Sequence, residues 1–397
     1  MNISNRLVRH VLFVYICNQK RAMIQRKILD DVSESLQKAN KIVILYGARQ
    51  TGKTTLSNAV ISGLKGRVLK INADELKYIE TLSSRDFQQM KLLIEGYDCL
   101  FIDEAQRIPN IGINLKIIHD NMPDLKILVT GSSSFDLANQ LNEPLTGRTI
   151  TYKLFPLALC ELHKEMNIFE LKDSLSTYLI YGMYPGLRAF DSAIGKEKHL
   201  TELSTAYLYK DIFELSAIRN PSKLRDLLKL LAFQIGSEVS IRELSQNLNI
   251  DQATVDGYID LLEKSFIVFR LGGFSRNLRK EISKKQKIYF WDTGIRNSLI
   301  NNFSTFDFRN DMGALWENFV IAERIKYLSY NNLNTLSYFW RTYTGAEIDY
   351  IEERNGRLSA FEIKVKSQNA KIPQTWADTY GGEFFTIHQD NFQDFLL

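Results

Sequence analysis

The sequence is poor in cysteine and histidine, the residues that most often bind zinc. Its 397 residues include three cysteines, Cys17, Cys99 and Cys160, which do not have metal-ligand spacing. The five histidines lie far from the cysteines and from one another, so the sequence predicts no zinc site. An odd, sparse set of cysteines is typical of a reducing compartment, and we therefore expect a cytoplasmic protein.

The sequence also lacks a hydrophobic run that predicts a membrane span. The apolar run at residues 11–17 has seven residues, against the ~20 that are needed to cross a bilayer. We interpret residues 1–22 as an N-terminal extension ahead of the fold, with Met23 as the natural first residue. The alternative is a segment that lies on a membrane surface.

Charge of one sign is not in large excess. The formal net charge of +4 is too small to indicate nucleic-acid binding by itself, so only a local cluster of lysine and arginine could do so. The apolar share of 45% and the charged share of 24% are those of an ordinary globular protein. A chain of 397 residues is expected to form two or three domains of about 100–200 residues each.

Residues 47–54 carry the most specific motif in the chain. They read Gly-Ala-Arg-Gln-Thr-Gly-Lys-Thr and match the phosphate-binding P-loop pattern G-x-x-x-x-G-K-[ST]. The apolar run before them predicts a buried parallel strand, and the segment after them predicts a helix whose N-terminus points at the phosphates. Lys53 would reach the β- and γ-phosphates, and the Thr54 hydroxyl would bind Mg²⁺. The predicted ATP site consists of Gly47, Ala48, Arg49, Gln50, Thr51, Gly52, Lys53, Thr54 and Thr55.

An acidic motif ends the strand that is predicted at residues 98–103. Four apolar residues lead into Asp103 and Glu104, the Walker B pattern. The strand end would place Asp103 beside Thr54, where it helps to hold Mg²⁺. Glu104 stands one residue further out, where a carboxylate can orient or deprotonate the attacking water. The acidic pair therefore predicts ATP hydrolysis as well as binding.

Two further residues are candidates for sensing the γ-phosphate. Ser132 lies in a Gly-Ser-Ser-Ser stretch at the tip of the strand predicted at residues 125–130, where a hydroxyl could contact the γ-phosphate or the attacking water. The alternative is a serine-rich loop that caps the next helix. Arg148 is the candidate γ-phosphate-sensing arginine, on its own chain or on a neighbour, and the alternative is a structural ion pair.

These motifs resemble those of a known group of proteins. The motifs that show the resemblance are residues 47–54, Phe-Ile-Asp-Glu-Ala-Gln at 101–106, Val-Thr-Gly-Ser-Ser-Ser at 129–134, and Gly-Arg at 147–148 followed by Phe-Pro-Leu at 155–157. They are similar to the motifs of prokaryotic ATPases of the AAA-like superfamily that join the ATPase to a C-terminal domain of unknown function with a nuclease-like core. The resemblance covers nearly the whole chain from Met23, and it implies ATP binding, ATP hydrolysis and a role on DNA.

The middle of the chain predicts a lid and a winged helix. Residues 160–220 form a mostly helical stretch that would cap the nucleotide, with a break at residues 181–186. After Pro221, three amphipathic helices precede two strands, at residues 267–271 and 287–291. Two helices joined by a short turn suit a helix-turn-helix, and the two strands would form its wing.

The loop between those two strands is strongly basic. Its lysines and arginines fit phosphate contacts with DNA. The alternatives are a solvated loop or a surface that binds protein, and the third helix is acidic, which makes it a poor face for the major groove. The basic residues are Arg276, Arg279, Lys280, Lys284, Lys285 and Lys287, against one anion, Glu281.

A β-hairpin is predicted near the C-terminus. Asn-Gly at residues 355–356 is a strong signal for a two-residue turn. This turn pairs Asp349 with Glu362. It also pairs Glu347 with Lys364, and alternation places these four side chains on one face. The opposite face, which is expected to pack on the core, carries Ile348, Tyr350, Phe361, Ile363 and Val365.

The opposed carboxylates of Asp349 and Glu362 predict a metal site. At about 5 Å they repel one another unless a divalent cation lies between them. Asp, then Glu-x-Lys on the next strand, is the PD-(D/E)xK nuclease arrangement, and the resemblance adds Glu317 to the Mg²⁺ ligands. Lys364 would lower the pKa of the attacking water or stabilise the transition state. The alternative is a charged solvent face on which Lys364 and Glu347 pair.

The predicted fold is α/β, with a parallel P-loop NTPase sheet of the AAA-like type, a helical lid, a winged helix and a C-terminal α/β domain like that of restriction endonucleases. The predicted protein uses ATP and Mg²⁺ to drive a module that acts on DNA. Its rivals are a nucleotide-dependent switch that binds a protein partner and carries an inactive nuclease-like domain, and a DNA-binding regulator with slow ATP turnover. The oligomeric state is left open. The predicted segments are 1–22 (extension), 23–159 (ATPase core), 160–220 (lid or linker), 221–297 (winged helix) and 305–397 (nuclease-like domain).

Overall fold

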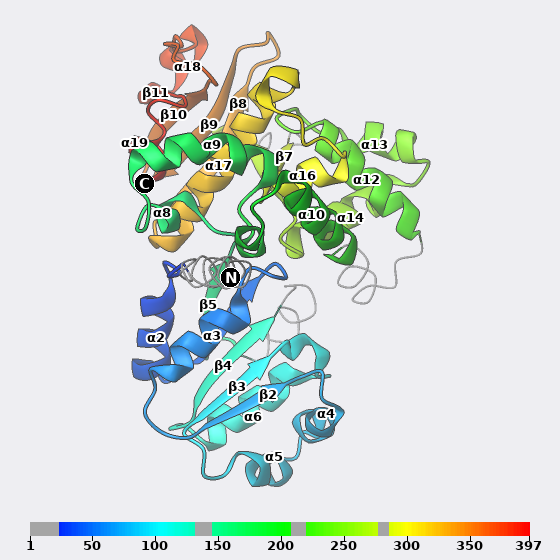
Figure 1. The fold of residues 1–397 in the computed structure, drawn as a ribbon, viewed down its shortest axis with the longest axis vertical. Coiled ribbons are helices and arrows are strands. Elements are labelled where there is room, and N and C mark those ends of the chain that lie inside the picture. The colour runs from blue at the N-terminus through cyan, green and yellow to red at the C-terminus, as the bar shows by residue number, and fades with distance from the viewer. Residues whose placement is uncertain (1–23, 132–144, 208–219, 277–285) are drawn as a thin grey trace, which may run out of the picture.

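The computed structural model describes residues 24–131, 145–207, 220–276 and 286–397. The chain forms two lobes, each built around one β-sheet (Figure 1). The predicted N-terminal extension, residues 1–22, lies outside the described residues.

A parallel sheet organises the first lobe, as the sequence predicts, and it has five strands. Its strand order is β2-β3-β4-β1-β5, and all of its pairs are parallel. The strands are β1 (Ile42–Gly47), β2 (Val68–Asn72), β3 (Cys99–Asp103), β4 (Lys126–Gly131) and β5 (Thr149–Leu154). All residues of β1 are buried, as expected for a central strand of a parallel sheet that is covered on both faces.

The parallel direction of these strands decides where a site can form. Because parallel strands all end at one edge of the sheet, the residues that follow β1, β3 and β4 meet there. The P-loop begins at Gly47, the last residue of β1, and helix α3 begins at Lys53 within the motif. The helices and turns of this lobe are α2 (Leu29–Lys38), α3 (Lys53–Ser62), α4 (Leu76–Ser83), α5 (Phe87–Ile94), η1 (Ala105–Arg107) and α6 (Ile111–Asn121).

The second lobe begins with the helices that the sequence predicts for the lid. These are α8 (Leu159–Leu162), α9 (Ile168–Tyr181), η2 (Pro185–Ala189) and α10 (Ala193–Tyr207). Three more helices follow in the predicted order, α12 (Pro221–Phe233), α13 (Ile241–Leu248) and α14 (Gln252–Lys264). Ser240 and Asp251 cap α13 and α14, because each side chain accepts a hydrogen bond from the backbone three residues on.

The remaining helices pack around the second sheet. They are α16 (Thr293–Leu299), η4 (Phe306–Phe308), α17 (Met312–Tyr330), α18 (Gln374–Thr379) and α19 (Gln393–Leu396). Of these, α17 has 19 residues and contacts β7, β10 and α19. No helix among the described residues is long and apolar enough to cross a membrane.

The six-stranded second sheet runs across a predicted domain boundary. Its order is β11-β10-β9-β8-β6-β7, so the two strands predicted as a wing belong to the same sheet as the C-terminal strands. The link is a parallel pairing of β6 with β8, at Gly272 with Tyr338 and Gly273 with Phe339. The boundary that the sequence places between 221–297 and 305–397 therefore divides one sheet. The strands are β6 (Val268–Gly273), β7 (Gln286–Phe290), β8 (Leu336–Arg341), β9 (Glu347–Arg354), β10 (Arg357–Ile363) and β11 (Glu383–Ile387).

One hydrophobic core extends through both lobes. Phe155, which follows β5, stacks on Trp291 of the second lobe with ring centroids 4.4 Å apart. Trp291 in turn contacts Phe269 of β6, also at 4.4 Å between centroids. A smaller separate cluster packs around Trp376 of α18 and contains Phe274, Trp340, Ile348, Ile351, Leu358 and Ala360.

Candidate functional site

The P-loop has the backbone that phosphate binding requires. Gly52 has a left-handed φ of 94° immediately before α3, a conformation that glycine adopts without strain. A Cβ at Gly47 would clash with the carbonyl oxygen of Leu154, so glycine is needed where β5 approaches the loop. The Lys53 ammonium donates to the carbonyl oxygens of Gly47 and Ala48 at 2.9 and 2.8 Å. The N-terminus of α3 and this ammonium together form an anion-binding end of the loop.

Asp103 and Thr54 meet at the edge of the sheet, as the sequence predicts. The Thr54 hydroxyl donates to one carboxylate oxygen of Asp103 at 2.8 Å. The Thr130 hydroxyl at the end of β4 donates to the other oxygen. A carboxylate and a hydroxyl beside a phosphate-binding loop are oxygen donors of the kind that Mg²⁺ prefers. The residues present therefore fit a magnesium ion bound together with a nucleotide.

Glu104 lies next to this pair in an uncommon backbone conformation. Its φ is 56°, in the left-handed region, which costs a non-glycine residue roughly 1–2 kcal/mol. Its carboxylate accepts a hydrogen bond from the Gln106 side chain at 2.5 Å, and its backbone N–H donates to the Thr130 hydroxyl at 3.1 Å. Neither Thr130 nor Gln106 is among the site residues predicted from the sequence. A single hydroxyl that ends an otherwise apolar strand beside β3 was the available signal for Thr130.

Of the two candidate γ-phosphate sensors, only Arg148 is among the described residues. Ser132 lies outside the described residues. Arg148 forms an ion pair with Asp120, at 2.7 and 3.1 Å, and this arginine lowers the pKa of the Asp120 carboxyl. Its carbonyl oxygen accepts from the N–H of Ile42, at the start of β1. Because β1 is about 16 Å long, at roughly 3.3 Å per residue, Arg148 lies at the opposite end of the sheet from the P-loop. The prediction that it senses the γ-phosphate of its own chain is wrong, and the alternative, an ion pair, is what the structure has.

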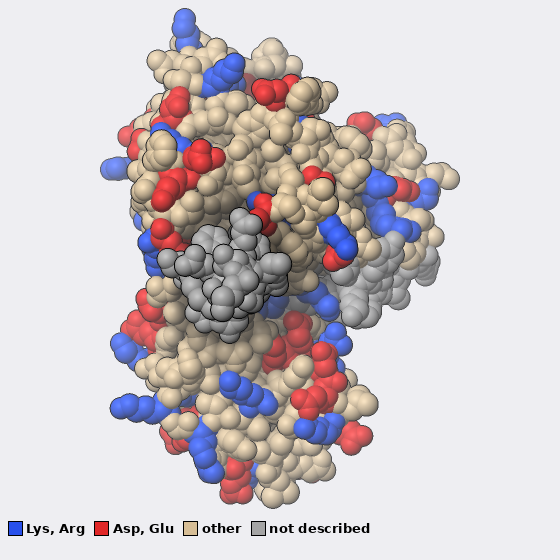
Figure 2. Space-filling model, viewed as in Figure 1, with Lys and Arg blue, Asp and Glu red and all other residues tan. Residues whose placement is uncertain are grey.

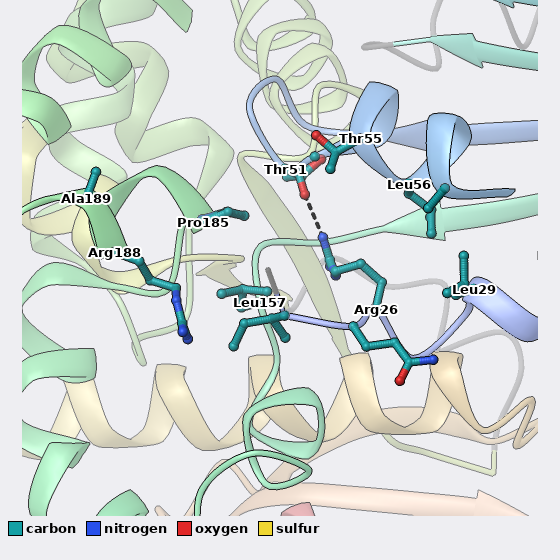
Figure 3. Close-up of a pocket in the computed structure, with 13 residues that line it drawn as sticks. Arg26, Leu29, Thr51, Thr55, Leu56, Leu157, Pro185, Arg188 and Ala189 are labelled. Atoms are coloured by element: carbon teal, nitrogen blue, oxygen red, sulfur yellow. Dashed lines mark hydrogen bonds between the residues drawn. The ribbon is translucent and has the colours of Figure 1, made fainter. Parts of the chain in front are cut away.

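A cavity of about 570 Å³ opens beside the P-loop, between the two lobes (Figure 3). Thr51, Gly52 and Thr55 contribute the phosphate-loop side. Pro185 and Arg188 reach it from the second lobe, from η2, which begins within the sequence break predicted at residues 181–186. One short element of the stretch predicted as a lid thus shares a cavity with the P-loop. The apolar part of the wall consists of Ile24, Leu29, Leu56, Ala59, Leu157 and Ala189.

The C-terminal hairpin has the predicted turn and register. Asn355 and Gly356 have positive φ values of 51° and 75°, as a two-residue turn of this kind requires. The pairs run from Arg357 with Arg354 to Phe361 with Tyr350, which confirms the predicted register over those positions.

A β-bulge changes which side chains share a face of this hairpin. Between β8 and β9 the register shifts from Tyr338 opposite Ile351 to Trp340 opposite Ile348, so β9 has one extra residue there. Ile348 and Ile351 both pack in the smaller core, whereas Tyr350 packs in the main core. The prediction that Ile348 and Tyr350 share a face is therefore wrong, because a bulge depends on the neighbouring strand and breaks simple alternation.

The predicted nuclease-like cluster contains a buried lysine from β7. The Lys287 ammonium lies 2.7 Å from a carboxylate oxygen of Glu347 and 3.1 Å from one of Glu317, and its side chain is 1% exposed. Tyr289, also in β7, donates its hydroxyl proton to Glu317 at 2.5 Å. The prediction that Lys287 is an exposed phosphate contact on a wing is therefore wrong. Arg276 is the only other described member of the basic loop, and residues 279–285 lie outside the described ranges.

The other predicted members of the cluster also have partners. Lys364 pairs with Glu362 at 2.6 Å, and not with Glu347 as the structural alternative supposed. Asp349 accepts a hydrogen bond from the backbone N–H of Ile363 at 2.8 Å. Burial raises the pKa of the Asp349 and Glu362 carboxyls. Burial also raises the pKa of Glu317 to about 7, against the lowering effect of the Lys287 charge.

The cluster does not fit the predicted metal ion. Within the described ranges, no three Asp, Glu, His or Cys side chains are placed to hold one metal. Lys287 and Lys364 instead supply positive charge at short range to Glu317, Glu347 and Glu362. Two ammonium groups of the chain itself thus lie at short range from Glu317 and Glu362, for which the sequence predicts Mg²⁺.

Three stretches of the chain match known family models. Residues 39–163 match the model described as an AAA domain. Residues 172–305 and 312–380 match two models described as domains of unknown function, DUF8612 and DUF4143. Among solved structures, a Walker-type ATPase of Pyrococcus abyssi is 17% identical with a TM-score of 0.47, and the match covers 71% of this chain and 97% of that one.

Relatives that match over most of their length define the family. A protein of Methanocaldococcus jannaschii described as uncharacterised is 26% identical over 344 residues, which cover 81% of this chain and 75% of that protein. A protein of Mycobacterium tuberculosis with the same description is 31% identical over 334 residues, which cover 82% of this chain and 70% of that protein. The chain belongs to the family of this mycobacterial protein, and its P-loop lobe is an AAA domain.

Proposed function

We propose that this protein binds ATP with Mg²⁺ at the P-loop and hydrolyses it. The contact between Thr54 and Asp103, at 2.8 Å, is the observation that carries the proposal, because it joins the phosphate loop to the acidic strand end. Thr54 and Asp103 would hold Mg²⁺, whose charge offsets that of the β- and γ-phosphates. Lys53 and the N-terminus of α3 bind the phosphates, and Glu104 orients the attacking water and accepts its proton.

The cavity beside the P-loop takes the base and the sugar. Its largely apolar wall suits a flat heterocycle, and its opening onto Thr51 and Gly52 leads to the phosphates. Since Pro185 and Arg188 come from the second lobe, a nucleotide in this cavity contacts both lobes. Bound nucleotide would therefore add contacts between the two lobes.

Replacing Glu104 with glutamine tests the hydrolytic part of the proposal. The amide keeps the size of the side chain but cannot accept the proton of water, so turnover is expected to fall by about 10²–10⁴. ATP affinity should stay within a few-fold of the unaltered protein. Phosphate release and the binding of a fluorescent ATP analogue measure the two quantities, and Glu80→Gln on the exposed face of α4 is the matched control. Unchanged turnover in Glu104→Gln would remove this residue from the proposed role.

For the second lobe we propose a module that binds its target and does not cut it. Lys287 and Lys364 pair with Glu317 and Glu362, two of the three carboxylates that the predicted metal site of a nuclease would use. DNA is the proposed target on the strength of the helix and strand order of residues 221–290 and of the resemblance, and a protein partner is the alternative. Cytoplasmic action is part of this proposal, because Cys99 and Cys160 are free thiols.

The distribution of charge on the surface limits where DNA could bind. Arg270 of β6 forms ion pairs with Asp256, Asp260 and Glu263 of α14, at 2.5 to 2.9 Å. These acids lower the suitability of α14 for the major groove. Figure 2 shows basic and acidic side chains interspersed over both lobes on the face drawn, with no broad area of one sign. DNA contact through α14 is therefore not part of the proposal.

Two assays separate these possibilities. Supercoiled plasmid incubated with the protein, ATP and Mg²⁺ or Mn²⁺ is expected to stay intact, and nicking that Asp349→Asn abolishes would contradict the inactive cluster. Phosphate release with and without duplex DNA is the second assay. Stimulation by DNA supports the DNA module, whereas an unchanged rate supports the switch that binds a protein partner.

A further inference from the structure

Arg26 joins the P-loop to three other parts of the chain. Its guanidinium donates four hydrogen bonds and the side chain is 8% exposed. The acceptors are the Thr51 carbonyl oxygen at 2.5 Å, the Phe155 carbonyl oxygen at 2.7 Å, the Glu161 carboxylate at 2.9 Å and the Tyr330 hydroxyl at 3.1 Å. Figure 3 shows the contact with Thr51 at the edge of the cavity.

The contact with Thr51 bears on phosphate binding. The C=O and the following N–H of a trans peptide point in opposite directions. Because the Thr51 carbonyl is directed at Arg26, the N–H of Gly52 points away from Arg26. The P-loop binds phosphate through inward N–H groups of this kind. Arg26 thus fixes the orientation of one peptide on which nucleotide binding depends.

The contact with Tyr330 brings in the C-terminal sheet. Tyr330 is the last residue of α17, is 2% exposed, and its hydroxyl also accepts from the Phe155 N–H at 3.1 Å. Two more residues of α17 bind the segment that follows β5, at residues 155–159. Glu323 accepts from the Leu159 N–H at 2.6 Å, and Lys326 donates to the Leu157 carbonyl at 3.4 Å.

These contacts all lie in the C-terminal half of α17. Positions 323, 326 and 330 recur at three and four residues and lie on one face of a helix. Glu317, which holds Lys287, lies near the other end of α17, about 20 Å away at 1.5 Å per residue. Helix α17 therefore connects Tyr330, which binds Arg26, with Glu317 of the carboxylate and lysine cluster.

We propose that Arg26 is a positioning residue of the nucleotide loop, and that Tyr330 makes nucleotide affinity depend on the position of α17. The inference rests on the proposed ATP site and adds a route by which the second lobe regulates it. When α17 holds its hydroxyl against Arg26, the guanidinium keeps the Thr51 peptide in the orientation that binds phosphate. Movement of α17 away from this position removes one partner of Arg26 and weakens ATP binding. By thermodynamic reciprocity, ATP favours the docked position of α17.

Tyr330→Phe in the full chain is the primary test, because it removes only the hydroxyl and leaves the ring packed near Phe155. ATP affinity is expected to fall about 3- to 10-fold, a part of what a hydrogen bond to a charged group can contribute. Arg26→Lys should lower the affinity for ATP by about 10- to 100-fold, because the three N–H donors of one ammonium cannot bind the four acceptors of the guanidinium. Tyr327→Phe is the control on the same helix, where the ring faces Arg324.

The double variant distinguishes regulation from general damage. Since the hydroxyl acts through Arg26, Tyr330→Phe is expected to cause no further loss of affinity in an Arg26→Lys background. Additive losses would contradict the inference. Hydrogen exchange gives a second readout, because ATP should slow amide exchange in the last turn of α17 in the unaltered protein and in Tyr327→Phe, but not in Tyr330→Phe.

The outcomes separate this inference from the proposed function. Failure of the unaltered protein to bind ATP would contradict both. Binding by the unaltered protein that Tyr330→Phe leaves unchanged, in a variant with a normal melting midpoint, would contradict the coupling and leave the ATP site standing. If Arg26→Lys does not fold, Tyr330→Phe with its exchange readout decides the matter alone.

Discussion

Lys53→Ala is expected to lower the affinity for ATP by at least 100-fold. Lys53 is 5% exposed and its ammonium lies over the loop, where it would form charge-assisted hydrogen bonds with two phosphates. Each such bond contributes about 1.5–3 kcal/mol, so the loss of two is worth about 3–6 kcal/mol. The dissociation constant of a fluorescent ATP analogue measures the effect.

The control for this prediction keeps the charge change but moves it away from the loop. Lys65→Ala removes an exposed lysine just beyond α3 and should leave ATP affinity unchanged. The melting midpoint without nucleotide should be recorded for both variants, because Lys53 also donates to the carbonyl oxygens of Gly47 and Ala48. If Lys53→Ala is folded and binds ATP as the unaltered protein does, the nucleotide lies elsewhere.

Lys287→Met is expected to lower the free energy of unfolding of the second lobe by about 3–5 kcal/mol, the usual cost of removing one partner from a buried ion pair. Methionine fills a similar volume, so the loss arises from Glu317 and Glu347, which stay in place without their cation. For a lobe of this size the melting midpoint should fall by roughly 10 °C. Lys229→Met on the exposed face of α12 is the control.

The dependence of this loss on pH identifies its electrostatic origin. The pKa of Glu317 is raised from 4.5 to about 7, so the folded state binds the proton more tightly than the unfolded state. Such a group lowers stability as pH rises from about 4.5 to 7, and the penalty is complete above that range. Without Lys287 the pKa of Glu317 rises further, and the pH range over which its ionisation lowers stability extends upward. The loss of stability caused by Lys287→Met should therefore be larger at pH 8 than at pH 6. Glu317→Gln added to Lys287→Met should recover part of the stability, and a deficit that does not vary with pH would contradict the ion pair as its cause.

The parts of the structure that the sequence predicts correctly are those written in local patterns. The P-loop, the strands that flank it and the contact of Asp103 with Thr54 follow from apolar runs and fixed motif spacing. The register of the C-terminal hairpin follows from residues 355–356 alone, because a two-residue turn fixes which positions pair.

The errors concern residues whose environment is set by distant segments. Lys287 lies in a basic stretch of sequence, but pairing of β6 with β8 places it beside acids 30 and 60 positions away. Arg148 follows a motif that suggested a sensor, yet its carbonyl and side chain bind Ile42 and Asp120 at the far end of the sheet. Arg26 carried no signal at all, since a single arginine before the first helix is ordinary in sequence.

The length of chain between Arg26 and Tyr330 has a consequence for how the protein matures. The two residues are 304 positions apart, so during synthesis the P-loop lobe emerges long before α17 exists. Until then the Arg26 guanidinium has no Tyr330 hydroxyl to bind, and closing so long a chain segment is slow compared with local folding. The nascent first lobe is therefore expected to bind nucleotide about 3- to 10-fold more weakly than the complete chain, since only the Tyr330 contact of Arg26 is missing. Full affinity for ATP would be reached only with the last quarter of the chain, when α17 has been made.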